Sequence, residues 1–173
     1  MADFNIKYGT PVAITMTGIE DIDASSTLVA GWTSGSVDNT TTVAVDYLVS
    51  GQFTTEASNR QAGTIAVYAY AAFNATPTWP DLFSAGTEGS VGAATVHDNE
   101  QLNSGMRLVA AITVDNTASG VYTFPPTSIA QIFGHVPPFW ALFVTSNATT
   151  TTTDWCVASG TALYHIPVEY TSA

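Results

Sequence analysis

The side chains able to act as acids, bases, nucleophiles or metal ligands are scattered along this 173-residue chain. The three histidines, His97, His135 and His165, lie far apart, and neither a His-x-x-x-His nor a Gly-x-Ser-x-Gly pattern occurs. A phosphate-binding Gly-x-x-x-x-Gly-Lys loop is also missing from the sequence, because Lys7 is the only lysine. The sequence therefore predicts no catalytic residue, no cofactor-binding residue and a protein that is not an enzyme.

Metal-ligand patterns are equally weak. Residues 20–23, Glu-Asp-Ile-Asp, form the densest acidic run, and paired acidic residues are typical of the start of a calcium loop. The later glycine and glutamate of such a loop do not follow, so a solvated loop or an acidic helix N-terminus is expected, with structural calcium as the weaker alternative. Cys156 is the sole cysteine and is expected to be a buried apolar residue. We therefore expect no metal ion and no cofactor.

One tryptophan stands out as a candidate for binding. Trp79 lies between Pro77 and Pro80 inside a long irregular stretch, residues 75–94. A tryptophan held in this way is suited to anchor a protein interface or to stack on a sugar, whereas the alternative is a ring folded back as a lid on the domain. We take Trp79 and Pro80 as candidate interface residues. The other tryptophans are expected in the core: Trp32, Trp140 and Trp155.

Composition excludes several classes of partner. Three basic residues against fourteen acidic ones give a formal net charge of −11, and only 10% of residues are charged. Lys7, Arg60 and Arg107 are too few and too far apart to form the basic patch that nucleic acids or anionic membranes require. No apolar run approaches the ~18 residues of a membrane span, and residues 1–10 lack a signal-peptide pattern. We expect neither a nucleic-acid nor a membrane partner.

Alternating hydrophobicity predicts strands along most of the chain. In the run 43–49, one face would hold Val43, Val45, Tyr47 and Val49. In the run 64–73, small alanines on both faces would allow a second layer to approach closely. Six further strands are expected, at residues 10–17, 26–32, 106–114, 121–124, 139–146 and 161–170.

Helical patterns are few and short. One is expected after Asp98 as N-cap, and another between Ser128 as N-cap and Gly134 as terminator. About eight strands separated by Gly, Asn and Asp turns, with one or two short helices, predict an all-β fold. The expected architecture is an antiparallel β-sandwich of jelly-roll type. Residues 12–173 are expected to form this single domain, and residues 1–11 an N-terminal arm or its first strand.

The segment 1–11 has an apolar residue at every second position. Phe4, Ile6 and Tyr8 alternate with polar residues, as in a strand with one apolar face. Such an arm can add a strand to the sheet edge of a neighbouring protein, whereas the alternative is an ordinary first strand of the same domain. Phe4, Ile6 and Tyr8 therefore join Trp79 and Pro80 as candidate interface residues.

Four segments are similar to those of a known group of proteins. They are Asp46-Tyr47-Leu48-Val49-Ser50-Gly51, Val67-Tyr68-Ala69-Tyr70-Ala71-Ala72, Pro77-Thr78-Trp79-Pro80-Asp81 and Pro137-Pro138-Phe139-Trp140-Ala141-Leu142-Phe143-Val144-Thr145. Their order and spacing resemble, over most of the chain, a family of small proteins from the structural gene clusters of tailed bacteriophages. The resemblance implies a head decoration, or cement, protein with a β-sandwich or jelly-roll fold. It implies no catalytic residue.

The composition agrees with such a structural role. Few charges and a mean hydropathy of +0.20 indicate that partner proteins cover part of the apolar surface. A net charge of −11 would repel packaged DNA, which favours the capsid exterior of a virion assembled in the host cytoplasm. The expected partners are the major capsid protein and further copies of this chain, a trimer being one arrangement. A carbohydrate-binding jelly-roll module on a phage tail or fibre is the alternative function.

Overall fold

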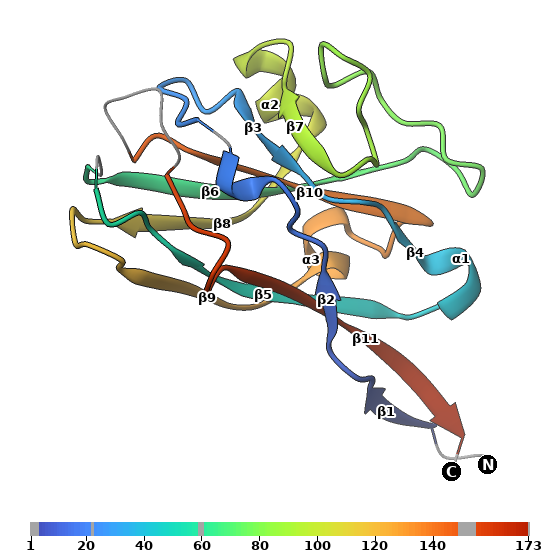
Figure 1. Ribbon diagram of the computed structural model, residues 1–173. Coiled ribbons are helices and arrows are strands. Elements are labelled where there is room, and N and C mark those ends of the chain that lie inside the picture. The colour runs from blue at the N-terminus through green and yellow to red at the C-terminus, as the bar shows by residue number, and fades with distance from the viewer. Residues whose placement is uncertain (1–3, 22, 59–60, 149–154, 173) are drawn as a thin grey trace.

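Two antiparallel β-sheets packed face to face make up most of the molecule (Figure 1). The computed structural model describes residues 4–21, 23–58, 61–148 and 155–172. The strands of this part are β1 (Phe4–Tyr8), β2 (Val12–Ile14), β3 (Ala30–Thr33), β4 (Val37–Asp38), β5 (Asp46–Thr54), β6 (Gly63–Ala71), β7 (Gly92–Thr95), β8 (Arg107–Val114), β9 (Val121–Ser128), β10 (Phe139–Ser146) and β11 (Ala162–Ser172). Sheet 1 has the order β1-β11-β5-β9, with β2 also paired to β11. Sheet 2 has the order β7-β3-β10-β6-β8, with β4 also paired to β10.

The predicted all-β sandwich is confirmed. The chain passes repeatedly from one sheet to the other, between β2 and β3, β4 and β5, β5 and β6, β8 and β9, β9 and β10, and β10 and β11, as in jelly-roll-like sandwiches. The described part holds eleven strands rather than about eight. The strands missing from the prediction are short, and β7 lies at the end of the stretch that was expected to be irregular.

The two predicted helices are present, are short and begin at the predicted caps. Helix α2 (Asn99–Gly105) begins where the Asp98 carboxylate accepts a hydrogen bond of 2.7 Å from the Gln101 amide. Helix α3 (Ile129–Phe133) begins where Ser128 Oγ accepts one of 2.9 Å from Gln131, and it ends at Gly134 with φ of 79°. A third helix, α1 (Asn39–Thr42), was not predicted. Glu20 and Asp21 of the acidic run 20–23 lie in a 3-10 turn (Ile19–Asp21), close to the acidic helix N-terminus that was one of the two expectations for this run.

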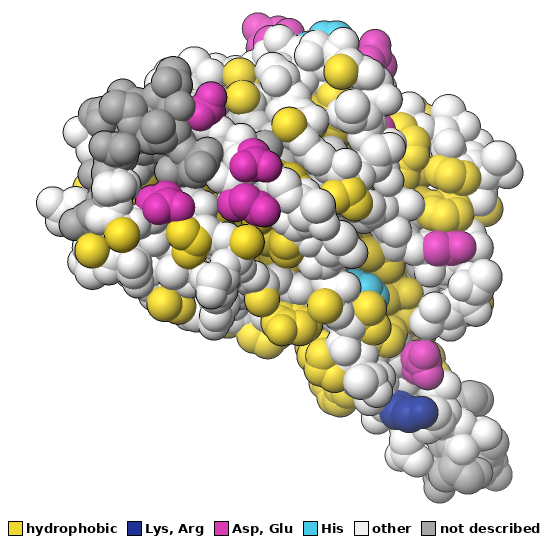
Figure 2. Space-filling model, viewed as in Figure 1, with side chains coloured by type: hydrophobic (Ala, Val, Ile, Leu, Met, Phe, Trp, Pro, Cys, Tyr) yellow, Lys and Arg dark blue, Asp and Glu magenta, His cyan; other side chains and the backbone are white. Residues whose placement is uncertain are grey.

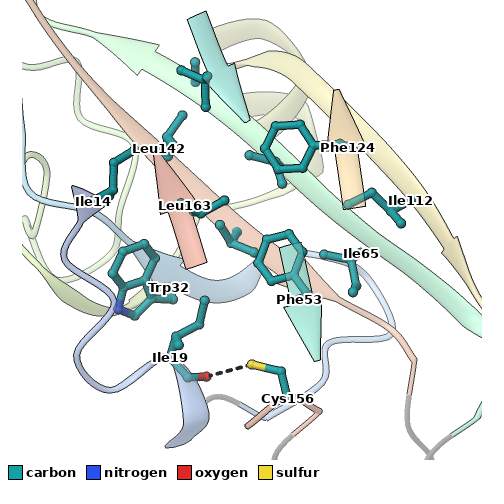
Figure 3. Close-up of a cluster of buried hydrophobic side chains, with 14 of the residues drawn as sticks. Ile14, Ile19, Trp32, Phe53, Ile65, Ile112, Phe124, Leu142, Cys156 and Leu163 are labelled. Atoms are coloured by element: carbon teal, nitrogen blue, oxygen red, sulfur yellow. Dashed lines mark hydrogen bonds between the residues drawn. The ribbon is translucent and has the colours of Figure 1, made fainter. Parts of the chain in front are cut away.

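The main core lies between the two sheets. Tyr47, Val49 and Phe53 of β5 face it from sheet 1, and it buries Trp32, Trp140 and Trp155 as expected. Figure 3 shows the side chains of Trp32, Phe53, Phe124 and Leu163 converging on this space. Cys156 is also buried there, as predicted, with its Sγ 3.7 Å from the carbonyl oxygen of Ile19 (Figure 3).

The first half of the predicted strand 43–49 is wrong. Val43 is 71% exposed and Val45 is also exposed, because β5 begins only at Asp46. Asp38 caps the preceding helix α1 through the Thr40 amide, and Val43 ends that helix in the left-handed region with φ of 50°. Local capping therefore overrides the alternating pattern in this segment.

A second apolar layer covers the outer face of sheet 2. It contains these buried residues: Tyr70, Leu82, Phe83, Ala94, Val96, Leu102, Met106, Ala141 and Phe143. Helix α2 and the stretch 75–94 supply part of this layer, as Figure 1 shows above β3 and β10. The alanines of the run 64–73 thus lie in a sheet that is buried on both faces, as their small size indicated.

Strand β11 is longer than the sandwich that contains it. Its residues 162–168 pair with β5, whereas its residues 168–172 pair with β1. This two-stranded extension, here called the ribbon (β1 with residues 168–172), projects from the body of the molecule (Figure 1). Residues 4–8 are therefore a strand paired with the chain's own β11.

Candidate interaction surfaces

The ribbon has one apolar face and one polar face. Ile6 lies opposite Tyr170, and Tyr8 lies opposite Val168, so these side chains share a face. On this face Ile6, Tyr8 and Tyr170 are 61%, 64% and 62% exposed. We call these three residues the apolar ribbon face. The side chain of Phe4, the other candidate of this segment, lies outside the described part of the structure.

Charge is confined to the polar face of the described ribbon. Lys7 lies directly opposite Glu169 there, so one positive and one negative group balance each other. Figure 2 shows acidic side chains over the body and hydrophobic ones gathered at the base of the ribbon. The apolar ribbon face is thus an uncharged surface on a chain whose net charge is −11.

The outer edge of β1 has backbone groups that pair with no strand of the described chain. The Gly9 amide donates a hydrogen bond of 2.8 Å to the Pro167 carbonyl, next to the Tyr8–Val168 pair. Because backbone groups alternate in direction along a strand, the N–H and C=O groups of Asn5 and Lys7 point toward β11. Those of residues 4, 6 and 8 therefore point away from β11 and form an open edge.

A second candidate surface surrounds an exposed phenylalanine. Phe73, which follows β6, is 74% exposed. Its amide donates to the Thr78 carbonyl at 2.9 Å, and the Asn74 side chain accepts from the Thr78 amide at 3.2 Å, so the turn is well ordered. Beside it is a hollow of about 470 Å³, here called the Phe73 hollow, whose lining includes Ala72, Phe73, Pro80, Arg107, Phe133 and His135.

Trp79 and Pro80 lie in different environments. Pro80 lines the Phe73 hollow, whereas the Trp79 ring is half-buried with its centroid 5.3 Å from that of Tyr70. A Cβ at Gly89 would lie only 2.7 Å from Trp79 Cζ2, so a glycine is required beneath the ring. This is the placement described by the lid interpretation of Trp79, and its role in an interface stays a prediction.

Buried polar contacts hold the stretch 75–94 against sheet 2. The Tyr70 hydroxyl lies 2.6 Å from Thr33 Oγ1 and accepts a hydrogen bond of 2.8 Å from the Gly89 amide. Burial raises the pKa of Tyr70 to about 12, so the hydroxyl keeps its proton at neutral pH. Glu88 Oε1 accepts hydrogen bonds from the Leu82 and Phe83 amides at 2.8 and 2.7 Å. The Gly89 hydrogen bond thus ties the loop to sheet 2, and the Glu88 hydrogen bonds close the loop on itself.

The histidines do not meet. His97 Nε2 lies 3.2 Å from Asp81 Oδ1 at the surface, and His135 lines the Phe73 hollow. His165 faces the main core, with its ring 5.4 Å from Tyr47 and 5.9 Å from Trp140. Its Nδ1 has no hydrogen-bond partner among the described residues, and burial lowers its pKa.

The described residues form neither a metal-binding cluster nor a membrane-spanning helix. Within residues 4–21, 23–58, 61–148 and 155–172, no group of three or more His, Cys, Asp or Glu is placed to hold a metal ion. In the same ranges, no helix is long and apolar enough to cross a membrane.

The chain was compared with known protein families, curated proteins and solved structures. No family model, no curated protein and no solved structure matches this chain. The resemblance to phage virion proteins therefore stays a prediction.

Proposed function

We propose that this chain is a non-catalytic structural protein of a tailed bacteriophage, a capsid decoration protein. It binds the outer surface of the head and bridges subunits of the major capsid protein. The resemblance of four segments to phage virion proteins and the confirmed β-sandwich support this role.

The Phe73 hollow is the observation on which the proposal depends most. A phenylalanine 74% exposed on an ordered turn contributes roughly 1.5–3 kcal/mol when a partner buries it completely. Because the turn is already fixed, little conformational entropy is lost when a partner covers it. Arg107, one of three basic residues of the chain, lies in the lining, so the hollow suits an apolar segment with neutral or acidic flanks. We assign this segment to the major capsid protein.

The mechanism is mechanical rather than chemical. Each copy contacts two or more coat subunits, so that rupture of the shell must break additional interfaces. Many weak contacts act together because neighbouring copies are held at a high effective concentration. The charge of −11 favours the exterior, since the packaged DNA inside repels acidic proteins.

Binding to heads tests the proposal directly. Purified full-length protein is added to phage heads assembled without it, and binding is measured by co-sedimentation and by imaging of the particles. The expected result is saturable binding with a regular arrangement on the head exterior. Wild-type protein that fails to bind heads, or that binds a glycan array and the tail instead, would overturn the proposal.

Two matched variants locate the contact. Phe73→Asp places a charge in the hollow and is expected to reduce head occupancy about tenfold or more, since the lost burial exceeds about 1.4 kcal/mol. Val121→Asp alters an apolar residue of β9 that is also exposed, and it is expected to leave occupancy unchanged. Equal occupancy for Phe73→Asp and wild type would exclude the Phe73 hollow as the coat contact.

A further inference from the structure

We propose that the open edge of β1 binds β1 of a second copy of this chain, antiparallel and centred on Ile6. The two ribbons then form one four-stranded sheet in the order β11-β1-β1-β11, with the two bodies at opposite ends. This self-association goes beyond the proposed function and does not depend on it. Three independent observations support it: the free edges of the two sheets, the direction of the β1 backbone groups and the side-chain pattern of β1.

The first observation is that β1 is the unprotected edge. At the other side of sheet 1, β9 has exposed Pro125 and Pro126, which have no N–H to donate to an incoming strand. In sheet 2, β8 packs against β9, and β7 is only four residues long. Strands β2 and β4 also pair on one side only, but they are three and two residues long. Strand β1 contains neither proline nor a bulge, and Lys7 is the only charged residue among its five.

A ribbon of two strands also needs further support. Two-stranded sheets are marginal in water, and independent stability usually requires three strands or more with a hydrophobic face. The ribbon projects from the body, so its outer edge is accessible to another molecule (Figure 1). Pairing with a second ribbon provides four strands and doubles the apolar face formed by Ile6, Tyr8 and Tyr170.

The backbone directions select the centre of the pairing. Residues 4, 6 and 8 direct their N–H and C=O groups outward, as derived from the Gly9 to Pro167 hydrogen bond. An antiparallel pairing centred on Ile6 places Ile6 opposite Ile6 and Phe4 opposite Tyr8. All of these residues have outward backbone groups, so each of these pairs exchanges both of its hydrogen bonds.

The side chains select the same register. With Ile6 at the centre, Asn5 lies opposite Lys7 of the second copy on the polar face, and no like charges meet. A centre at Lys7 would place two ammonium groups directly opposite each other, which is unfavourable. A centre between residues 6 and 7 would put the apolar face of one strand beside the polar face of the other.

Oligomeric state and thiol cross-linking test the proposal in solution, with the purified full chain and no phage particles. Sedimentation is expected to show a dimer. Ile6→Lys is expected to weaken the dimer about tenfold or more, since it replaces an apolar cross-strand pair with two opposed charges. The control Val121→Lys changes another exposed apolar residue and is expected to leave the dimer intact. Circular dichroism verifies that both variants remain folded.

Cysteine substitutions report the register. In a hydrogen-bonded antiparallel pair the two Cα atoms lie about 5.5 Å apart, within the range of a disulfide, so Ile6→Cys is expected to cross-link two copies on oxidation. Asn5→Cys alone is expected not to cross-link, because equivalent residues would be about 8 Å apart. A mixture of Asn5→Cys and Lys7→Cys is expected to cross-link again, because these positions face each other.

The outcomes separate this proposal from the proposed function. A dimer that cross-links through Ile6→Cys, with Asn5→Cys unreactive by itself, would support the Ile6-centred pairing. A monomeric or trimeric wild type would overturn it, and so would a dimer in which Asn5→Cys cross-links as well as Ile6→Cys. None of these results bears on whether the protein binds heads, which the co-sedimentation experiment decides separately.

Discussion

Removal of one buried hydroxyl should loosen the second apolar layer from sheet 2. In Tyr70→Phe the ring stays and only the hydroxyl oxygen is lost. Thr33 Oγ1 is also placed to donate to the Leu142 carbonyl at 3.2 Å, so we take Tyr70 as donor to Thr33 and acceptor from Gly89. The substitution therefore removes two hydrogen bonds and leaves the Gly89 amide without its partner.

The magnitude follows from these contacts. Two hydrogen bonds at about 1 kcal/mol each give a loss of about 2 kcal/mol in the free energy of unfolding. For a chain of this length, 1 kcal/mol corresponds to roughly 2–4 °C, so the unfolding temperature should fall by roughly 4–8 °C. Tyr164→Phe is the matched control, because its ring lies on the exposed outer face of sheet 1, and it should change stability by less than about 0.5 kcal/mol.

Urea unfolding of a double-mutant cycle completes the test. Thr33→Val, Tyr70→Phe and the double variant should show a coupling of about 0.5 kcal/mol or more, because the two side chains bond directly. If Tyr70→Phe proved as stable as wild type, or if the two changes were simply additive, the hydroxyl would not hold the loop as described.

Three further predictions concern other contacts. Gly31→Ala should destabilise the protein by about 1–3 kcal/mol in urea unfolding, because the added Cβ would lie 2.2 Å from the Val144 carbonyl oxygen inside the β3–β10 pairing. Gly35→Ala is the control and should cost less, because the nearest atom to its Cβ is Val91 Cγ2 at 3.3 Å. Equal losses of stability for the two variants would contradict the packing argument. Asp98→Ala should cost about 1 kcal/mol through loss of the α2 cap, whereas Asn103→Ala in the same helix should have little effect; a stable Asp98→Ala variant would show that the cap is dispensable. Burial lowers the pKa of His165 in the folded state, so the unfolded chain binds a proton at this residue more readily. The contribution of His165 to stability is therefore complete above about pH 6.5, and it is lost as the pH falls through the lowered pKa of the folded state. Below about pH 6.5, the free energy of unfolding of His165→Gln should therefore fall less than that of wild type, with His135→Gln as the control variant. Parallel plots of unfolding free energy against pH for wild type and His165→Gln would refute this.

Patterns that depend on neighbouring residues predicted much of this fold. The strand predicted at 139–146 coincides with β10, and Asp98 and Ser128 cap the two helices expected from their sequence. These features depend on a short run of mostly apolar residues or on a side chain bonding to a nearby amide, so a single sequence contains the necessary information. The burial of Cys156 and of three tryptophans follows from residue type alone.

Features that depend on distant partners were not predictable in the same way. Strand β4 is two residues long and exists because β10 lies beside it. The half-buried state of Trp79 depends on Tyr70 and Gly89, which are not its neighbours in the sequence. Phe73 was included in an apolar strand, but β6 ends at Ala71 and the Asn74–Thr78 turn leaves the ring outside. The Asn-x-Thr-Pro sequence that follows Phe73 is the local turn signal that could have revealed this.

The position of β10 sets the order in which parts of the molecule open. This strand pairs with β6 on one side and with β3 and β4 on the other, while apolar layers cover both of its faces. Its amide protons can exchange with deuterated solvent only when both layers separate, so they should be the last to do so. The outward amides of β1, which bond to no strand of the described chain, should exchange in a single copy well before those of β10. The strand proposed to recognise a second copy thus presents amides that exchange without local opening, whereas those at the centre of sheet 2 require the two layers to separate.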